Sequence, residues 1–241
     1  MSKNLNMNES LTIAIPLFNE EESISNLYKE LIDVLPEIEK DRIVNLLLVN
    51  DGSTDNTAKL LKKYFSEITN CYILHHQKNR NLDGFLETAI QNCNTELIVF
   101  LDSDCTFSPS YIVNMLDFLD KDTDIVNGSP YHPNGGVEGV NKARLVLSYF
   151  SNYIYRKITK KEIYTFTSIF KMYRLSKISE INLENTGFVS VSELFIKSLN
   201  EQAVSKEFPC TLTIRNFGES KIRIFQSIIS HIKFMYFLIK N

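Results

Sequence analysis

The sequence predicts an α/β fold in which a mostly parallel sheet is flanked by helices on both faces. Short apolar runs alternate with amphipathic segments through the first half of the chain, as expected for parallel strands joined by helices. The chain has 241 residues, 44% of them hydrophobic and 23% charged, which suits one globular domain with a small appendage. Polar motifs also follow several apolar runs, and parallel sheets bind ligands at that end of their strands.

The first half of the chain contains five predicted strands. They lie at residues 11–16, 43–50, 71–76, 96–102 and 123–129. The amphipathic segments between them predict helices at residues 20–35, 54–66, 84–93 and 109–119. The last of these helices is expected to begin with Ser108 as its N-cap and Pro109 at its first position. The second half is less regular and predicts helices at residues 139–157 and 189–200 and a strand at 203–209.

The last stretch of the chain, residues 222–240, predicts an amphipathic helix. Its apolar residues recur at helical spacing, at Phe225, Ile228, Ile229, Ile232, Met235 and Ile239. Polar and charged residues interrupt the stretch too often for a membrane-spanning helix. Two interpretations stay open, a helix that lies in a membrane interface and a helix that packs on the domain. We therefore divide the chain into a main domain, residues 1–221, and a helical appendage, residues 222–241.

The charge of the chain is unevenly distributed. The net charge is −3, but residues 141–178 carry a local charge of +8, which leaves −11 for the remainder. A solvated helix face is one interpretation of this segment. Because the basic residues are interleaved with aromatic and aliphatic ones, a surface that meets phosphates and lipid is the other. The negative overall charge and the lack of a recognition motif argue against nucleic acid as a partner.

Two further features predict the compartment. The four cysteines form no CxxC pair and no metal-finger spacing, which is typical of reduced thiols in a cytosolic protein. The N-terminal stretch "MSKNLNMNES" is polar, so we expect no secretory signal.

An apolar run ends in two aspartates one residue apart, in the stretch "VFLDSDCTFSP". Positions two apart in an extended chain point the same way, so Asp102 and Asp104 direct their carboxylates toward one spot. Turn formation or helix capping is the structural alternative, but Ser108 and Pro109 already fill the capping role. Two hard oxygen ligands suit Mg²⁺ or Mn²⁺, which also binds pyrophosphate oxygens. The pair therefore predicts a metal site.

Two more motifs follow the first and second predicted strands. In "VNDGSTDNT", Asp51 is placed to accept hydrogen bonds from a nucleotide base, although the same stretch also suits an ordinary strand–turn–helix connection. In "IPLFNEEESI", the residues at the corresponding strand end are Pro16, Phe18 and Glu20, and Glu20 is a candidate for ribose hydroxyls. Convergence of these motifs with the aspartate pair on one sheet edge predicts a nucleotide site there.

Four motifs together resemble the inverting family-2 glycosyltransferases, which have the GT-A fold. They are "IPLFNEEESI", "VNDGSTDNT", "FLDSDCTFSP" and "RNFGESK" at residues 215–221. Within that family the likeness is greatest to the polyprenyl-phosphate sugar synthases, of the dolichyl-phosphate mannose synthase type. The resemblance implies a metal-dependent enzyme that moves a sugar from a UDP- or GDP-sugar to a lipid phosphate. It also implies a cytoplasmic protein bound peripherally to a membrane surface.

The resemblance implies roles for residues on the donor side. The residues that would bind the nucleotide-sugar are Pro16, Phe18, Glu20, Val49, Asp51, Asp102, Ser103 and Lys221. Asp102 and Asp104 would hold Mg²⁺ or Mn²⁺ on the diphosphate, which makes Asp104 a catalytic residue. Arg215, also assigned a catalytic role, would close over the donor phosphates together with Lys221.

The resemblance also implies an acceptor side. Arg144 and Ser148, one helical turn apart, would grip the acceptor's phosphate, and Glu193 matches a family acid near the acceptor. A solvated helix acid is the alternative for Glu193. The chain departs from the family pattern at Thr106, Pro130, Thr165 and Ile169. These departures concern the acceptor and the sugar more than the nucleotide site.

Two other functions stay open. One is transfer to a glycan hydroxyl, which needs a carboxylate base such as Glu193. A phosphate monoester, with a second pKa of about 6, is ionised at neutral pH and attacks unaided. The other is a degenerate family member that binds nucleotide or membrane without transferring a sugar. Retention of the whole nucleotide and metal set favours an enzyme.

Overall fold

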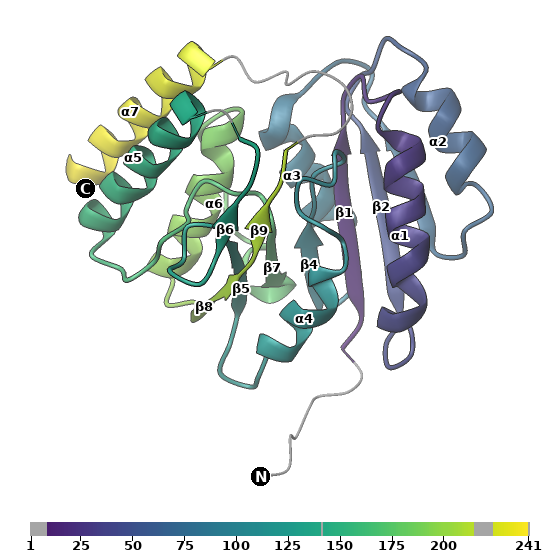
Figure 1. Ribbon diagram of the computed structural model, residues 1–241, viewed down its shortest axis with the longest axis horizontal. Coiled ribbons are helices and arrows are strands. Elements are labelled where there is room, and N and C mark those ends of the chain that lie inside the picture. The colour runs from purple at the N-terminus through teal and green to yellow at the C-terminus, as the bar shows by residue number, and fades with distance from the viewer. Residues whose placement is uncertain (1–8, 141, 215–223, 241) are drawn as a thin grey trace.

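The computed structural model describes residues 9–140, 142–214 and 224–240, and its centre is a seven-stranded sheet (Figure 1). From one edge to the other, the strands are β3 (Cys71–His75), β2 (Val44–Asn50), β1 (Leu11–Leu17), β4 (Leu97–Phe100), β7 (Lys171–Arg174), β5 (Ile125–Ser129) and β8 (Ser205–Pro209). All neighbouring pairs are parallel except the two that β7 makes. The predicted α/β class and mostly parallel sheet are confirmed.

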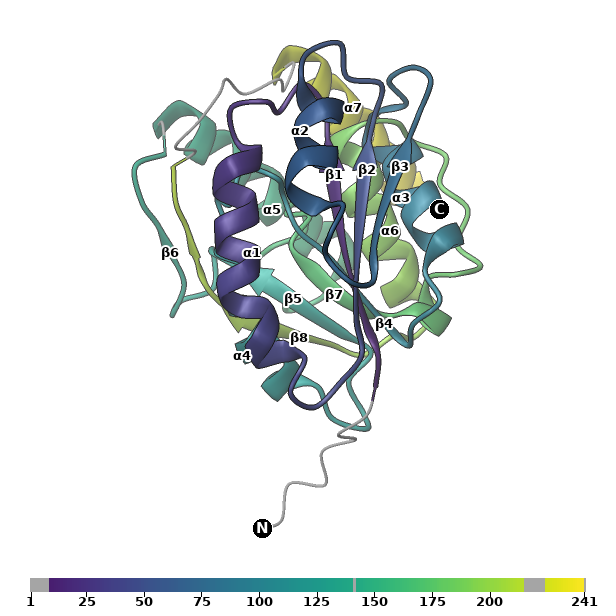
Figure 2. The same cartoon turned by 90° about the vertical axis from the view of Figure 1, so that its right-hand side faces the viewer.

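Helices cover both faces of the sheet (Figure 2). One face packs against α1 (Ile24–Ile38), α2 (Thr57–Phe65) and α4 (Tyr111–Phe118). The other packs against α3 (Asn81–Asn92), α5 (Lys142–Thr159), α6 (Phe188–Asn200) and α7 (Ile224–Lys240). Two hydrophobic cores result, one on each side of the sheet.

The burial of the strands explains their sequence pattern. β2 is buried at all seven positions because both faces of the sheet are covered, so its centre reads as the apolar run "LLLV" rather than as an alternation. The helices show the complementary pattern. The side chains that α1 buries recur at helical spacing, at Ile24, Leu27, Leu31, Val34, Leu35 and Ile38.

The predicted boundary of α4 is wrong at its start. The helix begins at Tyr111 with Ser110 as its N-cap. Ser108 and Pro109 instead form a turn ahead of it, in which the carbonyl of Ser108 accepts the Tyr111 N–H at 3.1 Å and that of Pro109 accepts the Ile112 N–H at 3.0 Å. The first turn of the predicted helix is therefore not α-helical.

The sequence did not predict β7, which runs antiparallel between β4 and β5. Its four residues, "KMYR", are too short to show a strand period and begin and end with a charge. The strand has a topological consequence. Because β7 runs in the opposite direction, the loop that precedes it lies at the same edge as the carboxyl ends of β1, β2 and β4. A second, two-stranded sheet of β6 (Gly136–Val137) and β9 (Thr211–Leu212) was not predicted either.

The C-terminal helix α7 packs on the domain, against α5 and α6. Phe234 and Met235 are buried in the core on that side of the sheet, and His231 Nδ1 lies 2.7 Å from the Tyr155 hydroxyl. The opposite side of α7 exposes apolar side chains, among them Ile232 at 59%. Among the described residues, no helix combines the length and apolarity that crossing a membrane requires.

Candidate functional site

Three loops meet at the carboxyl edge of the sheet, at the upper end of β1, β2 and β4 in Figure 1. Leu17 pairs with Asn50 at the ends of β1 and β2, and Asp51 N–H donates to the Leu17 carbonyl at 2.8 Å. On the other side of β1, Leu101 N–H donates to the Ala14 carbonyl at 3.1 Å. This register brings the three motifs to one edge, as the alternation of strands and helices predicted.

The loops after β1 and β2 are held to one another by hydrogen bonds. Asn19, with a φ of 53°, donates its N–H to Ser53 Oγ at 2.9 Å, and its Oδ1 accepts the Thr54 N–H at 2.8 Å. Gly52 has a φ of 70°, and a Cβ there would lie 2.5 Å from the backbone of Asn79. Only glycine fits this close approach. The loops after β1, β2 and β3 therefore form one interlocked unit.

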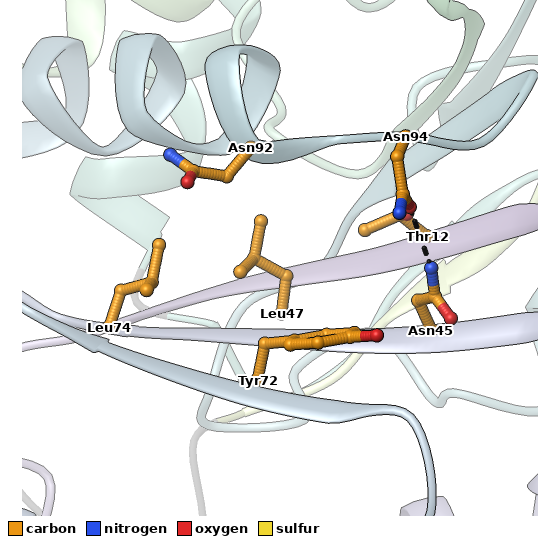
Figure 3. Close-up of a pocket in the computed structure, with 7 residues that line it drawn as sticks. All are labelled: Thr12, Asn45, Leu47, Tyr72, Leu74, Asn92 and Asn94. Atoms are coloured by element: carbon orange, nitrogen blue, oxygen red, sulfur yellow. Dashed lines mark hydrogen bonds between the residues drawn. The ribbon is translucent and has the colours of Figure 1, made fainter.

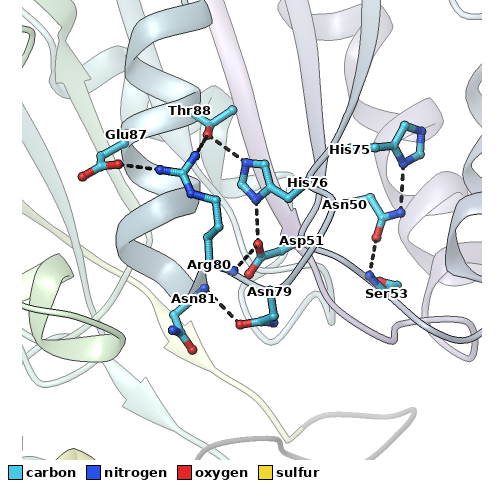
Figure 4. A network of polar contacts seen from close by, with 10 residues as sticks. All are labelled: Asn50, Asp51, Ser53, His75, His76, Asn79, Arg80, Asn81, Glu87 and Thr88. Carbon is cyan, nitrogen blue, oxygen red and sulfur yellow. Dashed lines mark hydrogen bonds and ion pairs between the residues drawn. The ribbon is translucent and has the colours of Figure 1, made fainter.

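Asp51 is buried at this edge in a single orientation, fixed by hydrogen bonds (Figure 4). Its Oδ1 lies 2.6 Å from His76 Nδ1 and accepts the Arg80 N–H at 2.8 Å. His76 Nε2 is in turn 2.8 Å from Thr88 Oγ1 on α3. The carboxylate is thus oriented by a histidine and a backbone amide, the kind of support that precise ligand recognition requires.

The aspartate pair lies on a tight turn that follows β4. Asp102 and Asp104 are half-exposed, while Ser103 between them is buried. The Cys105 N–H donates to the Asp102 carbonyl at 3.4 Å, and the Thr106 N–H to Asp104 Oδ1 at 3.1 Å. The turn keeps both carboxylates at the carboxyl edge of the sheet.

The donor set at this turn fits a hard divalent cation. Within the described residues, no third His, Cys, Asp or Glu joins Asp102 and Asp104 in a cluster of metal ligands. Mg²⁺ is commonly bound by one or two carboxylates together with substrate phosphates and water. The two aspartates therefore fit a cation whose remaining ligands are a diphosphate and water.

The other predicted donor residues occupy different environments. Pro16 and Phe18 are half-buried at the end of β1. Glu20 is buried, and its Oε2 accepts the Ser23 hydroxyl proton at 2.6 Å. Val49 is fully buried in the core that faces α3, so a nucleoside would meet only its main chain there.

Two predicted phosphate-binding residues, Arg215 and Lys221, lie outside the described residues. The chain leading to them is placed beside the aspartate turn. Thr213 donates its N–H at 2.9 Å and its hydroxyl at 3.1 Å to the Thr106 carbonyl. The last described residues before this segment are therefore held against Thr106, two residues after Asp104.

The predicted acceptor residues Arg144 and Ser148 both lie on α5. The side chain of Arg144 is outside the described part of the structure, and Ser148 is half-buried. A hydrogen bond joins the side chains of Ser148 and Tyr131, and burial raises the pKa of Tyr131. Tyr131 also packs on Tyr149 with ring centroids 4.3 Å apart. Tyr131 was not predicted from the sequence, although it stands next to Pro130 in the segment that departs from the family pattern.

The structure places Glu193 in a role that differs from the predicted one. Its side chain is 1% exposed, and its two oxygens accept the N–H groups of Glu184 at 2.9 Å and Asn185 at 2.8 Å. Lys197, one turn further along α6, pairs with it at 2.8 Å. These contacts stabilise the loop ahead of α6. A carboxylate engaged in this way is not available as a general base.

A hollow of about 250 Å³ lies away from the aspartate turn (Figure 3). It is lined by Thr12, Asn45, Leu47, Tyr72, Leu74, Asn92 and Asn94. Thr12 and Asn45 stand near the starts of β1 and β2, at the edge opposite Asp102. The lining has no charged side chain that suits a diphosphate, so the hollow is not the donor site.

The family description "Glycosyl transferase family 2" matches residues 12–181. Over 217 residues the chain is 25% identical to polyprenol monophosphomannose synthase of Mycolicibacterium smegmatis, covering 87% of this chain and 80% of that protein. It is 25% identical to dolichol-phosphate mannosyltransferase of Pyrococcus furiosus, covering 95% of this chain and 64% of that protein. A third relative is dodecaprenyl-phosphate galacturonate synthase of Rhizobium johnstonii, 26% identical over 95% of this chain and 67% of that protein.

Solved structures of glucosyl-3-phosphoglycerate synthase from Mycobacterium tuberculosis share the fold. The complex with phosphoglyceric acid has a TM-score of 0.71 at 12% identity, covering 96% of this chain and 80% of that one. The complex with Mn²⁺, uridine diphosphate and glucosyl-3-phosphoglycerate has a TM-score of 0.67 at 12% identity, covering 94% and 80%. Because the family match spans most of the chain, the protein belongs to glycosyl transferase family 2 and is a glycosyltransferase with the GT-A fold.

Proposed function

We propose that this protein transfers a sugar from a nucleotide-sugar to a polyprenyl phosphate at a membrane surface, with inversion at the anomeric carbon. The observation that carries the proposal is the convergence of the three loops at one sheet edge, where Asp51 follows β2 and the aspartate pair follows β4, on either side of β1. The three relatives are named for mannose or galacturonate and for polyprenol, dolichol or dodecaprenyl carriers. Their names therefore support an acceptor class rather than a particular sugar.

On the donor side, different residues along the sheet edge would bind the base and the diphosphate of the nucleotide. Asp51, held by His76 and the Arg80 amide, would accept hydrogen bonds from the base with Oδ2. Asp102 and Asp104 would hold Mg²⁺ or Mn²⁺, which when bound offsets the charge that builds on the departing nucleotide diphosphate. The donor would be a UDP- or GDP-sugar.

On the acceptor side, the contacts of Glu193 favour a phosphate over a hydroxyl. A hydroxyl acceptor needs a base in the transition state, and the Glu193 carboxylate is engaged with two backbone amides and Lys197. A phosphate monoester, with a second pKa of about 6, needs no base at neutral pH. Ser148 on α5 and the predicted ligand Arg144 are then the groups that would bind its oxygens.

The surface formed by α5 and α7, which we call the α5–α7 face, supports a lipid acceptor. Its exposed apolar side chains are Val146, Tyr149, Phe150, Tyr153, Ile229, Ile232, Tyr236, Phe237 and Ile239. Lys157 lies 5.5 Å from the Tyr153 ring and Lys240 4.7 Å from the Tyr236 ring. Apolar and aromatic residues mixed with lysines are typical of helices that lie in a membrane interface. Because Ser148 is on α5, a lipid phosphate held there would stay at that interface.

The experiment that tests this function is a transfer assay with radiolabelled UDP- and GDP-sugars and Mn²⁺, with and without polyprenyl phosphate in detergent. We expect label to enter the organic phase only when the lipid phosphate is present. Asp104→Ala should abolish this transfer, and Asp33→Ala, which removes an exposed acid from α1, should not change it. Label that moves only into a water-soluble product would contradict the lipid acceptor.

A further inference from the structure

A row of buried polar side chains crosses the sheet just below the carboxyl edge. In the strand register, Lys171 on β7 pairs with Asn127 on β5, and Asn127 pairs with Glu207 on β8. Directly paired residues point to the same face, so the three side chains lie side by side. Lys171 and Asn127 are completely buried. Burying a charge or an amide is costly unless each group is hydrogen-bonded, so the partners of this row reveal its role.

Two members of the row bind the backbone of the loop at residues 164–168. Glu207 accepts the Tyr164 N–H at 2.9 Å with Oε2 and the Thr165 N–H at 3.1 Å with Oε1. Asn127 Nδ2 donates to the Thr165 carbonyl at 2.8 Å and to Glu207 Oε1 at 3.2 Å. The start of the loop is therefore fixed by side chains from β5 and β8.

Lys171 fixes the end of the same loop. Its Nζ donates to the Ser168 carbonyl and lies 4.9 Å from the centre of the Phe195 ring. The next residue back, Phe170, stacks on Phe107 with centroids 5.1 Å apart, which ties the loop to the segment that follows the aspartate pair. The loop thus lies beside the aspartate turn.

A fourth side chain, Asn152 on α5, links the loop to the predicted acceptor residues. Its Oδ1 accepts the N–H groups of Phe166 at 2.6 Å and Thr167 at 3.2 Å. Its Nδ2 donates to the Ser148 carbonyl at 2.8 Å and to Thr167 Oγ1 at 3.1 Å. Asn152 is therefore hydrogen-bonded to both Ser148 and Thr167 and connects the two residues.

This clamped loop presents two half-buried hydroxyls, those of Thr167 and Ser168. Each already accepts a hydrogen bond from the protein, Thr167 Oγ1 from Asn152 and Ser168 Oγ from the Phe170 N–H at 3.1 Å. A hydroxyl has one proton to donate in addition to its acceptor sites. Each hydroxyl therefore keeps a proton that it can donate to an oxygen that only accepts, such as a phosphate oxygen.

We propose that Thr167 and Ser168 donate hydrogen bonds to the acceptor's phosphate, opposite Ser148. Asn127, Asn152, Lys171 and Glu207 act as positioning residues that hold the loop in place. This inference rests on the proposed function and extends the acceptor site from α5 to the loop ahead of β7. Hydrogen bonds to a charged oxygen contribute about 1.5–3 kcal/mol each, so the loss of one should weaken acceptor binding by about tenfold or more.

The first test replaces the hydroxyls. Thr167→Val and Ser168→Ala should each raise the KM for polyprenyl phosphate about tenfold and change the KM for the nucleotide-sugar by less than twofold. Thr167→Ser, which keeps the hydroxyl, should retain the wild-type acceptor KM. Matched controls are Thr69→Val and Ser66→Ala, which remove exposed hydroxyls between α2 and β3. Wild-type acceptor KM values in both hydroxyl variants would overturn the inference.

The second test addresses the positioning residues. Glu207→Gln retains one acceptor oxygen but loses the other, so one of the two loop amides is left without its partner. We expect faster hydrogen exchange at Tyr164 or Thr165 together with a raised acceptor KM and an unchanged melting temperature within a few degrees. Glu201→Gln, at the exposed end of α6, is the control. A faster-exchanging loop with a wild-type acceptor KM would overturn the positioning role.

The same assays separate this inference from the proposed function. If the wild-type protein transfers no sugar to a lipid phosphate, both are wrong. If the wild-type protein transfers sugar and the hydroxyl variants match it in acceptor KM, only the inference fails.

Discussion

At the scale of single residues, His76 is the side chain that orients the Asp51 carboxylate, which we propose binds the nucleotide. The imidazole lies 2.6 Å from Asp51 Oδ1 and is held on its other side by Thr88. His76→Leu should let the Asp51 carboxylate rotate. It also removes one hydrogen-bond donor from a buried carboxylate, which should lower the free energy of unfolding by about 1–3 kcal/mol. We expect the donor KM to rise about tenfold while the acceptor KM stays within twofold. Equal effects on both KM values would contradict this role.

The buried Lys171 gives a prediction for stability as a function of pH. Burial lowers its pKa from 10.5 to about 7, so between pH 7 and 10.5 the unfolded chain holds a proton that the folded protein lacks. The free energy of unfolding should therefore rise with pH across this window, by up to about 4 kcal/mol from this group. Lys171→Met cannot titrate and should lack that rise. Urea titrations of both proteins from pH 7 to 10 check it, and parallel curves would contradict the lowered pKa.

Residue by residue, the sequence located the polar groups at the carboxyl edge better than the contacts that support them. The paired aspartates were evident because two acids after an apolar run have few structural uses. The burial of Lys171 was not evident, because a lysine in "FKMYR" is expected to be exposed. It is buried only because β7 pairs with β4 and β5. Glu193 was expected to be catalytic or solvated. It instead accepts hydrogen bonds from the backbone of Glu184 and Asn185, a contact that no local sequence pattern predicts.

At the scale of elements, the docking of α7 depends on a neutral histidine. Burial lowers the pKa of His231 to about 4, and its Nδ1 faces the Tyr155 hydroxyl on α5. Between pH 6.5 and 4 the unfolded chain binds a proton that the folded protein does not. Stability should therefore fall as pH falls through this window, by about 3 kcal/mol at most.

His231→Gln tests this prediction because it keeps a partner for Tyr155 but does not titrate. The variant should lose less stability than the wild type between pH 6.5 and 4, and hydrogen exchange in α7 should accelerate only in the wild type. A wild-type α7 that exchanges equally slowly at both pH values would contradict the prediction.

Elements were predictable where the sequence is locally periodic. The parallel strands and the helices of the first half were found within a few residues because each buries a regular stripe or a continuous apolar run. β7, β6 and β9 have four residues or fewer, and their existence depends on pairing with distant strands. The start of α4 was misplaced because Ser108 and Pro109 suit both a helix start and a turn.

At the scale of the whole molecule, the α5–α7 face is the surface on which we propose that the protein meets a lipid acceptor, since no described helix could span a membrane. Phe150 and Ile232 are 60% and 59% exposed on the two helices. Phe150→Asp combined with Ile232→Asp should reduce binding to vesicles at least tenfold, because it removes buried apolar area and places two acids near the headgroups.

The matched control for this prediction is Ile43→Asp. Ile43 is 65% exposed. It directly precedes β2, at the edge of the sheet opposite the carboxyl ends of the parallel strands. Cosedimentation with anionic vesicles should be lost only in the double variant, while transfer to a short-chain lipid phosphate in detergent persists. If the wild type, the double variant and Ile43→Asp bind vesicles equally, the α5–α7 face is not the surface that binds membranes.

Asp51, Asp102 and Asp104 lie at the same edge of the sheet, and calorimetric titration of nucleotide diphosphate measures whether this edge binds the donor. With Mn²⁺ present, UDP or GDP should bind the wild-type protein, and chelation of the metal should weaken that binding at least tenfold. Asp102→Asn combined with Asp104→Asn should match the chelated wild type whether or not Mn²⁺ is added. Nucleotide binding that depends neither on the metal nor on the two aspartates would contradict a metal-dependent donor site at this edge.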